Sequence, residues 1–156
     1  QLMEWLKDLN RTNRLNEVGA GLIGDLGVDV LLQSSFASKL ERLDLKNNDL
    51  TDVSVIALSR SEKLKRLVSL NLSKNNITDA GAKALAGSSS LGKLKKLDLN
   101  FNRIGDEGAN AIARSPNFAN LESLKLGQNK IGTEGAQALN ESKTLQNLIH
   151  PIFGFY

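Results

Sequence analysis

The residues of this chain that could carry out chemistry are one histidine, a set of carboxylates and several closely spaced glycines. The histidine, His150, is next to a proline near the end of the sequence, and the chain has no cysteine. A histidine-based triad needs partners around the imidazole, and a zinc site usually needs several His or Cys ligands. The composition therefore excludes a multi-histidine metal site and any thiolate or disulfide chemistry.

The carboxylates most regularly placed for a shared task are Asp25, Asp52, Asp79 and Asp106, which recur every 27 residues. Each aspartate precedes an amphipathic stretch, which is rich in alanine in most copies. In the last copy, Thr133 occupies the position of the aspartate. Asp and Thr at the start of such a stretch are typical N-caps of helices. We expect these acids to cap their helices rather than to act as general acids or bases.

Glycines three residues apart also recur with this period and could suggest a phosphate-binding loop; they are Gly24/Gly27, Gly105/Gly108 and Gly132/Gly135. The chain contains no G-x-x-x-x-G-K-[ST] sequence, so the recurrence indicates glycines that allow close packing of helices. We therefore expect no catalytic residue, no cofactor, no metal and no enzymatic activity within this chain.

The elements that position these residues follow from the leucines. The pattern L-x-x-L-x-L-x-x-N-x-[LI] occurs in residues 40–50, 67–77, 94–104 and 121–131. This pattern resembles the leucine-rich repeat. Within each copy, L-x-L alternates with the period of a strand, and stacked copies can bury the leucines that one strand would leave exposed. A helix follows, and an apolar residue plugs the core before the next strand: Leu64, Leu91, Phe118 or Leu145.

An asparagine column, Asn48, Asn75, Asn102 and Asn129, falls where each strand ends and the chain turns. An amide side chain both donates and accepts hydrogen bonds, so a stack of asparagines can satisfy the backbone groups of the turns. We expect this column to be structural rather than ligand-binding.

The sequence predicts one α/β domain, a right-handed solenoid bent into a horseshoe arc. Short parallel strands form its concave face, and helices form its convex face. The expected units are a capping helix (1–12), a divergent repeat (13–39), four repeats (40–66, 67–93, 94–120 and 121–147) and a C-terminal cap or truncated repeat (148–156). At a fixed period, Asn13, Asn16, Val18 and Gly21 take the Leu, Leu, Leu and Asn positions of the divergent repeat. The helix at 1–12 has a second interpretation, docking to a partner.

The tail I-x-D-x-G-A-x-A-L of the repeat resembles the ribonuclease-inhibitor-like class of leucine-rich repeats. Ser115–Leu121 and Ile104–Ala109 resemble repeats of bacterial proteins, including effectors delivered into host cells. Unlike the mammalian inhibitor, this chain has no cysteine, so the resemblance implies a protein-binding module and not ribonuclease inhibition. It leaves two other interpretations open: a targeting domain of a larger enzyme, and a regulator similar to GTPase-activating proteins of this repeat class.

The chain has a net charge of +3 and a pI near 9.2. Many of its Lys and Arg residues fall between helix ends and strand starts, and we call this region the basic edge. This edge includes Lys39, Arg42, Lys63, Lys65, Arg66, Lys93, Lys95 and Lys96. Bases stabilise helix C-termini, so the edge has a structural cause. No aromatic residues are interleaved for base stacking, which argues against nucleic acid. We expect an acidic protein partner, no membrane span, a monomer, and a cytoplasmic location or delivery into a host cell.

The strand residues that alternate with the leucines, and those at the strand exits, vary between copies and are the expected binding surface. The predicted site residues are Arg42, Asp44, Lys46, Asn71, Lys74, Lys96, Asp98, Asn100, Phe101, Lys125 and Gln128. Five strands about 4.8 Å apart, each exposing about 16 Å, provide only about 400 Å². A standard interface buries about 800 Å² per partner. Either the partner also contacts the loops or an end of the array, or the binding is weak, or the full protein is longer.

Overall fold

The computed structural model describes residues 14–15 and 23–149. One parallel sheet runs in the order β1-β2-β3-β4-β5. Its strands are β1 (Arg14–Leu15), β2 (Arg42–Asp44), β3 (Ser69–Asn71), β4 (Lys96–Asp98) and β5 (Ser123–Lys125). The α-helices are α2 (Gly24–Gln33), α3 (Asp52–Arg60), α4 (Asp79–Ala86), α5 (Asp106–Arg114) and α6 (Thr133–Asn140). Short 3-10 helices lead into the strands: η1 (Ala37–Lys39), η2 (Glu62–Leu64), η3 (Ser89–Leu91) and η4 (Pro116–Phe118).

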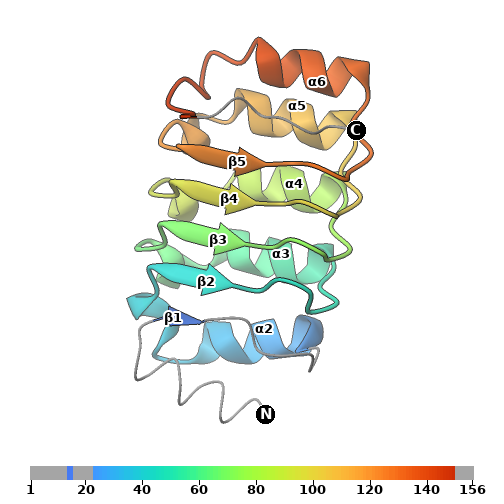
Figure 1. Ribbon diagram of the computed structural model, residues 1–156. Helices are drawn as coiled ribbons and strands as arrows, with labels where there is room; N and C mark the ends of the chain where they lie inside the picture. The colour runs from blue at the N-terminus through green and yellow to red at the C-terminus, as the bar shows by residue number, and fades with distance from the viewer. Residues whose placement is uncertain (1–13, 16–22, 150–156) are drawn as a thin grey trace.

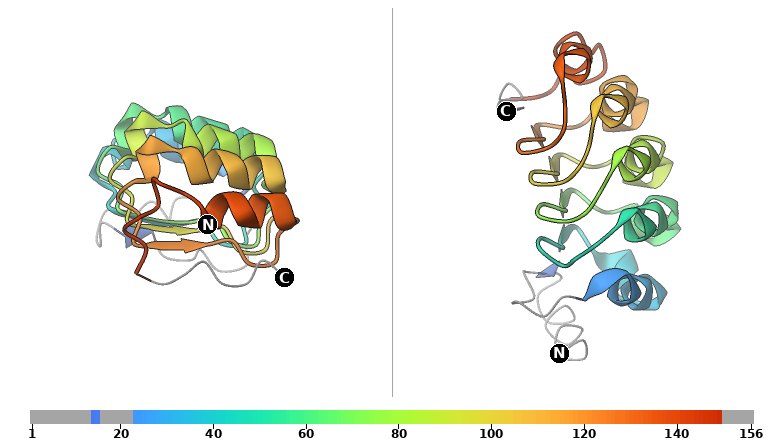
Figure 2. Two further views of the ribbon diagram at one scale, coloured as in Figure 1. Left: turned by 90° about the horizontal axis from the view of Figure 1, so that it is seen from above. Right: turned by 90° about the vertical axis from the view of Figure 1, so that its right-hand side faces the viewer.

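The strands lie side by side on one side of the molecule and the helices on the other (Figure 1). Seen along the strands, each repeat forms one coil of the stack (Figure 2). This arrangement confirms the predicted α/β repeat fold, with parallel strands in one sheet alternating with helices. The solvent-facing side of the sheet is called the concave face below, and the helical side is called the convex face.

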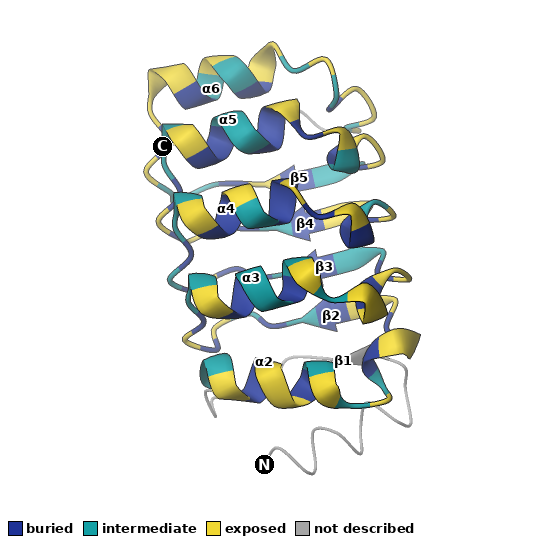
Figure 3. Ribbon diagram, turned by 180° about the vertical axis from the view of Figure 1, so that it is seen from behind, coloured by how far each residue is buried: buried dark blue, intermediate teal, exposed yellow. Residues whose placement is uncertain are grey.

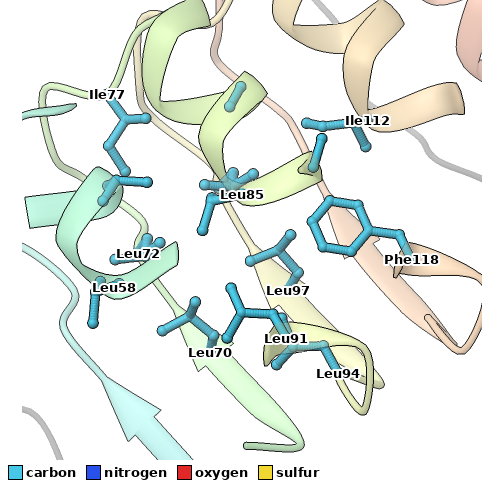
Figure 4. Packing of buried hydrophobic residues seen from close by; sticks show 14 of the residues in the cluster. Leu58, Leu70, Leu72, Ile77, Leu85, Leu91, Leu94, Leu97, Ile112 and Phe118 are labelled. Atoms are coloured by element: carbon cyan, nitrogen blue, oxygen red, sulfur yellow. The ribbon is translucent and has the colours of Figure 1, made fainter. Parts of the chain in front are cut away.

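The core lies between these two layers. The strand leucines Leu70 and Leu97, the helix residues Leu85 and Ile112, and the plug Phe118 are at most 1% exposed (Figure 4). The helices bury the face turned to the sheet and expose the opposite one (Figure 3). All four predicted plugs are buried, which confirms that the segment before each strand closes the core.

The asparagine column has the structural role that the sequence predicts. The Oδ1 atom of Asn75 accepts hydrogen bonds from the backbone of Asn48 (3.1 Å) and Leu50 (3.0 Å). Its Nδ2 donates to the carbonyls of Leu45 and Leu72, both at 3.0 Å. Each asparagine thus satisfies buried backbone groups of two repeats, whose loss would cost roughly 1–3 kcal/mol per group.

The first strand departs from the fixed period. Leu15, one residue earlier than the expected Asn16, pairs with Leu43, and Arg14 pairs with Arg42. The helix that follows keeps the period, since Asp25 and Asp52 take equivalent places in α2 and α3. The divergent unit therefore contains one extra residue between strand and helix. The predicted capping helix at 1–12 lies outside the described residues.

The chain re-enters the strand register after α6. The backbone N–H of Ile149 donates to the carbonyl of Glu122 at 3.0 Å, as Glu122 N–H donates to Lys95 one repeat earlier at 2.8 Å. Residues 148–149 therefore begin a further coil in phase. The rest of the predicted C-terminal segment, including His150, lies outside the described residues.

Candidate functional site

The concave face is built from two rows of side chains that alternate with the buried leucines. The strand register places Arg42, Ser69, Lys96 and Ser123 in one row. It places Asp44, Asn71, Asp98 and Lys125 in the neighbouring row. A groove of about 500 Å³ lies over these rows and is also lined by Glu122 and Ile149. The structure therefore brings six of the predicted site residues together in one groove: Arg42, Asp44, Asn71, Lys96, Asp98 and Lys125.

The second row also stabilises the turns at the strand ends. Oδ1 of Asp44 accepts from the backbone of Lys46, and Oδ1 of Asp98 accepts from that of Asn100, both at 3.0 Å. Oδ1 of Asn71 accepts from Ser73 N at the same distance. Across the last strand pair, Lys125 Nζ lies 3.8 Å from Asp98 Oδ2. One oxygen each of Asp44, Asn71 and Asp98 is thus held by the fold, and all three residues line the groove.

The predicted residues Lys46 and Asn100 follow the two rows along the chain and contribute less free surface. Both side chains are half-buried. Oδ1 of Asn100 accepts from the backbone of Gly127 at 2.7 Å, so its amide is part of the turn in the next repeat. The equivalent Ser73 is only 5% exposed.

The predicted residues Lys74, Phe101 and Gln128 lie at the strand exits, on the rim of the face. Together with Asn47 they have positive φ angles between 55° and 57°, a conformation that bulky side chains rarely adopt. The Phe101 backbone is fixed by a 2.9 Å hydrogen bond from its N–H to the Gly127 carbonyl. Its ring is 51% exposed and has Lys74 Nζ 5.6 Å from its centre. Phe101 is therefore a half-exposed aromatic whose backbone is held in place at the exit of β4.

The basic edge is partly neutralised by glutamates that the sequence analysis did not pair with it. Arg66 Nη2 lies 3.0 Å from Glu41 Oε1, Lys95 Nζ lies 3.0 Å from Glu122 Oε1, and Lys65 contacts Glu62. Lys63 Nζ donates to three carbonyls at the end of α2, the nearest at 2.8 Å. Within the described ranges, the cations of the edge that form no ion pair or hydrogen bond through the side chain are Lys39, Arg42, Lys93 and Lys96.

The aspartate column caps helices, but in the neighbouring repeat rather than its own. Asp79 is the first residue of α4, and its Oδ1 accepts from the backbone of Gly105 (2.7 Å) and Gly108 (2.8 Å) at the start of α5. Asp52 and Asp106 make the same contacts to the next helix. The prediction that these acids are N-caps of their own helices is therefore wrong. The residues at the N-cap positions are Ile23, Thr51, Thr78, Gly105 and Gly132, and Thr133 is the first residue inside α6.

Asp25 shows the electrostatic effect of this contact most clearly. Partial desolvation acts to raise its pKa, but hydrogen bonds from the side chains of Ser54 and Thr51 and from their backbone act in the other direction and prevail. Its pKa therefore lies below the ordinary value of 3.8. A carboxylate held ionised by several donors is a structural anchor and is poorly suited to transfer protons.

The recurring glycines make room for these carboxylates. A Cβ at Gly108 would lie 2.6 Å from Asp79 Oδ1 and 2.7 Å from Ile104 Cγ2, and a Cβ at Gly135 would lie 2.6 Å from Asp106 Oδ1. Gly24 is an exception to the prediction, since a Cβ there would meet nothing within 4 Å and the residue has a φ of 60°. The glycines of the last two pairs are packing residues, as predicted. The close neighbours that require them are the aspartate of the preceding repeat and the isoleucine of their own repeat, and not the sheet.

Besides the core leucines, four groove residues are absent from the predicted site: Ser69 and Ser123 lie in the first outward-facing row, and outside both rows lie Glu122 and Ile149. The latter two carry the signal that would have found them, since each lies one residue before the outward-facing strand position. Ile149 is 67% exposed and adds an apolar surface at the last coil.

Across the described residues, no group of three or more His, Asp or Glu side chains is arranged to hold a metal ion. None of the helices in that part of the chain has the length and apolar character of a membrane span.

The fold and its groove define a repeat-built scaffold with an open face. The chain is a leucine-rich repeat protein: two family models described as leucine rich repeat match it, one over residues 38–104 and one over residues 119–139. Domains of this family generally mediate protein–protein interaction and are typically non-enzymatic scaffolds. A search of curated proteins finds no match.

Similar solved structures include the following two. Actin-binding site 2 of leiomodin-1 is similar with a TM-score of 0.55 and 22% identity, over 76% of this chain and 73% of that one. An internalin from Listeria monocytogenes matches 71% of this chain and 47% of its own length, with a TM-score of 0.32 and 21% identity. At these identities the leiomodin-1 likeness supports the fold alone.

Proposed function

We propose that this protein binds a protein partner through the concave face and the adjacent basic edge. The observation that carries the proposal is the groove of about 500 Å³ that gathers seven charged or amide side chains, with the half-exposed Phe101 at a strand exit of the same sheet. These side chains are polar and held on a rigid sheet, which suits recognition of a surface rather than a buried small molecule.

Phe101 supports this assignment through its backbone conformation. A positive φ costs a non-glycine residue about 1–2 kcal/mol, and asparagine tolerates it best among ordinary residues. Asn47 occupies the equivalent place with φ 55°. A phenylalanine there is unfavourable for the fold, so contact with a partner is a sufficient reason for an aromatic at this position.

The basic edge supplies the additional area that a stable complex needs. The concave face alone offers about half of a standard interface per partner. Lys39 and Lys93 are exposed and, within the described residues, form no ion pair. They lie in the segments that lead into β2 and β4, and they add positive charge near a groove whose lining balances three cations against three carboxylates. This added charge favours acidic residues in the part of the partner that contacts the edge.

The subtype and the biological role rest on sequence resemblance. The helix in each complete described repeat and the I-x-D-x-G-A sequence support a ribonuclease-inhibitor-like repeat. The segments Ser115–Leu121 and Ile104–Ala109 support a bacterial effector that acts on a host protein. The name of the leiomodin-1 region says that it binds actin, but that likeness supports only the fold.

The test is affinity capture from eukaryotic lysate with matched variants. The concave-face variant is Phe101→Ala/Lys96→Glu/Lys125→Glu. The control, Leu26→Ala/Arg60→Glu/Arg114→Glu, makes the same charge change and truncates one exposed apolar residue on the convex face. Circular dichroism checks that both variants remain folded.

We expect the wild type and the control to capture the same protein and the concave-face variant to lose it. Equal capture by all three forms, or capture of no specific protein, would refute concave-face recognition.

A further inference from the structure

The charges of the concave face repeat every second strand. Strand β2 reads Arg-Leu-Asp and β4 reads Lys-Leu-Asp, whereas β3 reads Ser-Leu-Asn and β5 reads Ser-Leu-Lys. Arg42 and Lys96 therefore share one row with a serine between them, and Asp44 and Asp98 share the other row with Asn71 between them. Cations and acids face the groove in parallel lines, with one uncharged strand between the charged ones.

The negative charges are not required by the turns that these side chains stabilise. Asn71 accepts the turn hydrogen bond at 3.0 Å, the distance found for Asp44 and Asp98. A neutral amide is therefore sufficient for the fold. The charge at Asp44 is available for contact with another molecule, whereas that at Asp98 is shared with Lys125, whose Nζ lies 3.8 Å from Asp98 Oδ2.

The positive charges are also available. Arg42 and Lys96 are exposed, and within the described residues neither forms an ion pair. Their neighbours on the edge, Arg66 and Lys95, are paired with glutamates. Three cations face the groove: Lys125 is paired with Asp98, and Arg42 and Lys96 are the two that the protein itself does not neutralise.

The spacing of these rows limits the shape of a ligand. Neighbouring parallel strands lie about 4.8 Å apart, so equal charges two strands apart are separated by about 9.6 Å. An extended strand advances about 10 Å in three residues, but residues i and i+3 point to opposite faces. A polyproline II helix repeats every 9.3 Å or so, yet such ligands dock in aromatic-lined grooves. The described lining of this groove contains no aromatic residue.

An α-helix satisfies the spacing. Residues i and i+7 lie on one face and are about 10.5 Å apart. Residue i+3 or i+4 lies halfway between them along the axis and slightly to one side. The small side chains of Ser69 and Asn71 on β3 leave room for that turn between the charged strands.

We propose that the groove binds an α-helix of a partner protein, laid along the stack of strands. Two carboxylates seven residues apart contact Arg42 and Lys96, and a basic residue three or four positions after the first lies between Asp44 and Asp98. This inference rests on the proposed function, since it specifies the part of the partner that the concave face contacts.

The direct test measures peptide binding to the full chain by fluorescence anisotropy. The first peptide is an alanine-based helix of about 18 residues, long enough to be helical, with Glu, Lys and Glu at i, i+4 and i+7. The second has the same composition with the glutamates five residues apart, on different faces. The third is proline-rich with glutamate at every third position.

We expect the first peptide to bind at least about tenfold more tightly than the other two, with an affinity that falls as salt is raised. Equal binding of the first two peptides, tighter binding of the proline-rich one, or no binding at all would overturn the helical assignment. Each of these results would leave the affinity capture described above as a separate test of concave-face binding.

A charge exchange tests the residues. Arg42→Glu/Lys96→Glu should lose the first peptide and gain a peptide with Lys at all three positions, since the middle residue still faces Asp44 and Asp98. The control Arg60→Glu/Arg114→Glu has the same charge change and the same two-repeat separation, on α3 and α5. It should keep the preference of the wild type. Loss of binding in the control as well would show that only net charge matters and would refute the proposed row contacts.

Discussion

At Phe101 the backbone and the side chain have opposite requirements. The residue has a φ of 56°, and its half-exposed ring has Lys74 Nζ 5.6 Å from its centre. Asparagine relieves about 1–2 kcal/mol of backbone cost, while loss of an exposed cation–π contact removes about 0.5–1 kcal/mol. We expect Phe101→Asn to raise the free energy of unfolding in urea slightly, by up to about 1 kcal/mol, while partner capture falls.

A clear loss of stability in Phe101→Asn would contradict this and would show that the ring packs as part of the fold. Asn47, which already occupies the equivalent position, is the internal reference for the tolerated side chain.

Single residues also show where sequence reasoning succeeds. The asparagine column was predicted because the number of donors and acceptors in an amide matches what a turning strand leaves unpaired. The aspartate column was assigned to the wrong helix because residues one repeat apart have the same phase. A periodic sequence fixes the position within a repeat but not which copy supplies the partner, so Asp79 could not be assigned to Gly105 and Gly108 in advance.

The start of α3 is the element whose stability should depend most clearly on pH. The pKa of Asp25 is lowered in the folded state, so its contribution is present above the ordinary value of 3.8 and is lost as pH falls through the lower folded value. We expect Asp25→Asn to be less stable than the wild type at pH 7. The difference should be constant down to about pH 5 and disappear well below pH 4.

Denaturant unfolding of both proteins from pH 7 to pH 2.5 measures this difference. If it persisted unchanged at the lowest pH, the ionised carboxylate would not be the stabilising group.

The start of α5 allows a test of packing. Glycine to alanine inside a helix normally stabilises, but a Cβ at Gly108 would lie 2.6 Å from Asp79 Oδ1 and 2.9 Å from Ala82 Cβ. We expect Gly108→Ala to cost about 1–3 kcal/mol in urea unfolding. Gly108→Ser should cost less, because Ser54 occupies the equivalent place in α3 and donates to Asp25 through its hydroxyl.

Gly92→Ala is the control, since its Cβ would meet only the Ser89 carbonyl, at 3.6 Å. A gain in stability with Gly108→Ala would show that the aspartate does not need the space.

The elements were predicted as far as the pattern is regular. Helices and strands from β2 onward match the leucine and alanine periodicity, whereas β1 was placed one residue late. In β1, Leu15 rather than Asn16 pairs with Leu43 of β2. The extra residue between β1 and α2 interrupts the 27-residue period at this point. Hydrophobic periodicity has no information on such an insertion when the unit has few leucines.

Across the whole molecule, each repeat is stabilised mainly by its neighbours. Leu99 is fully buried. We expect Leu99→Ala to lower the free energy of unfolding by about 2–5 kcal/mol. Hydrogen exchange should show the loss of protection in β3 and β5 as well as β4, and less change in α2, because the coupling is between adjacent repeats. An effect confined to one repeat would contradict this coupling.

The overall fold could be predicted from the sequence because the leucine and asparagine pattern of one strand and turn occurs four times. The interactions of the surface side chains were harder to predict from the sequence. Rows such as Arg42 and Lys96 come directly from strand alternation, but the ion pairs of Arg66 with Glu41 and Lys95 with Glu122 depend on the reach of long side chains between repeats. The amount of free positive charge on the edge therefore required the structure.

Both ends of an interior helix are completed by other coils. Asp79 caps the start of α5, and the Ser142 hydroxyl donates at 2.5 Å to the Ala113 carbonyl at its end. Any segment of 27 residues, wherever it begins, contains one residue that caps a helix start and one that caps a helix end. A second copy of such a segment therefore continues the array in register. Gene duplication of whole units can therefore lengthen such an array without inventing a new junction. An insertion of any other length separates each carboxylate from its amides, which selects for change in complete units.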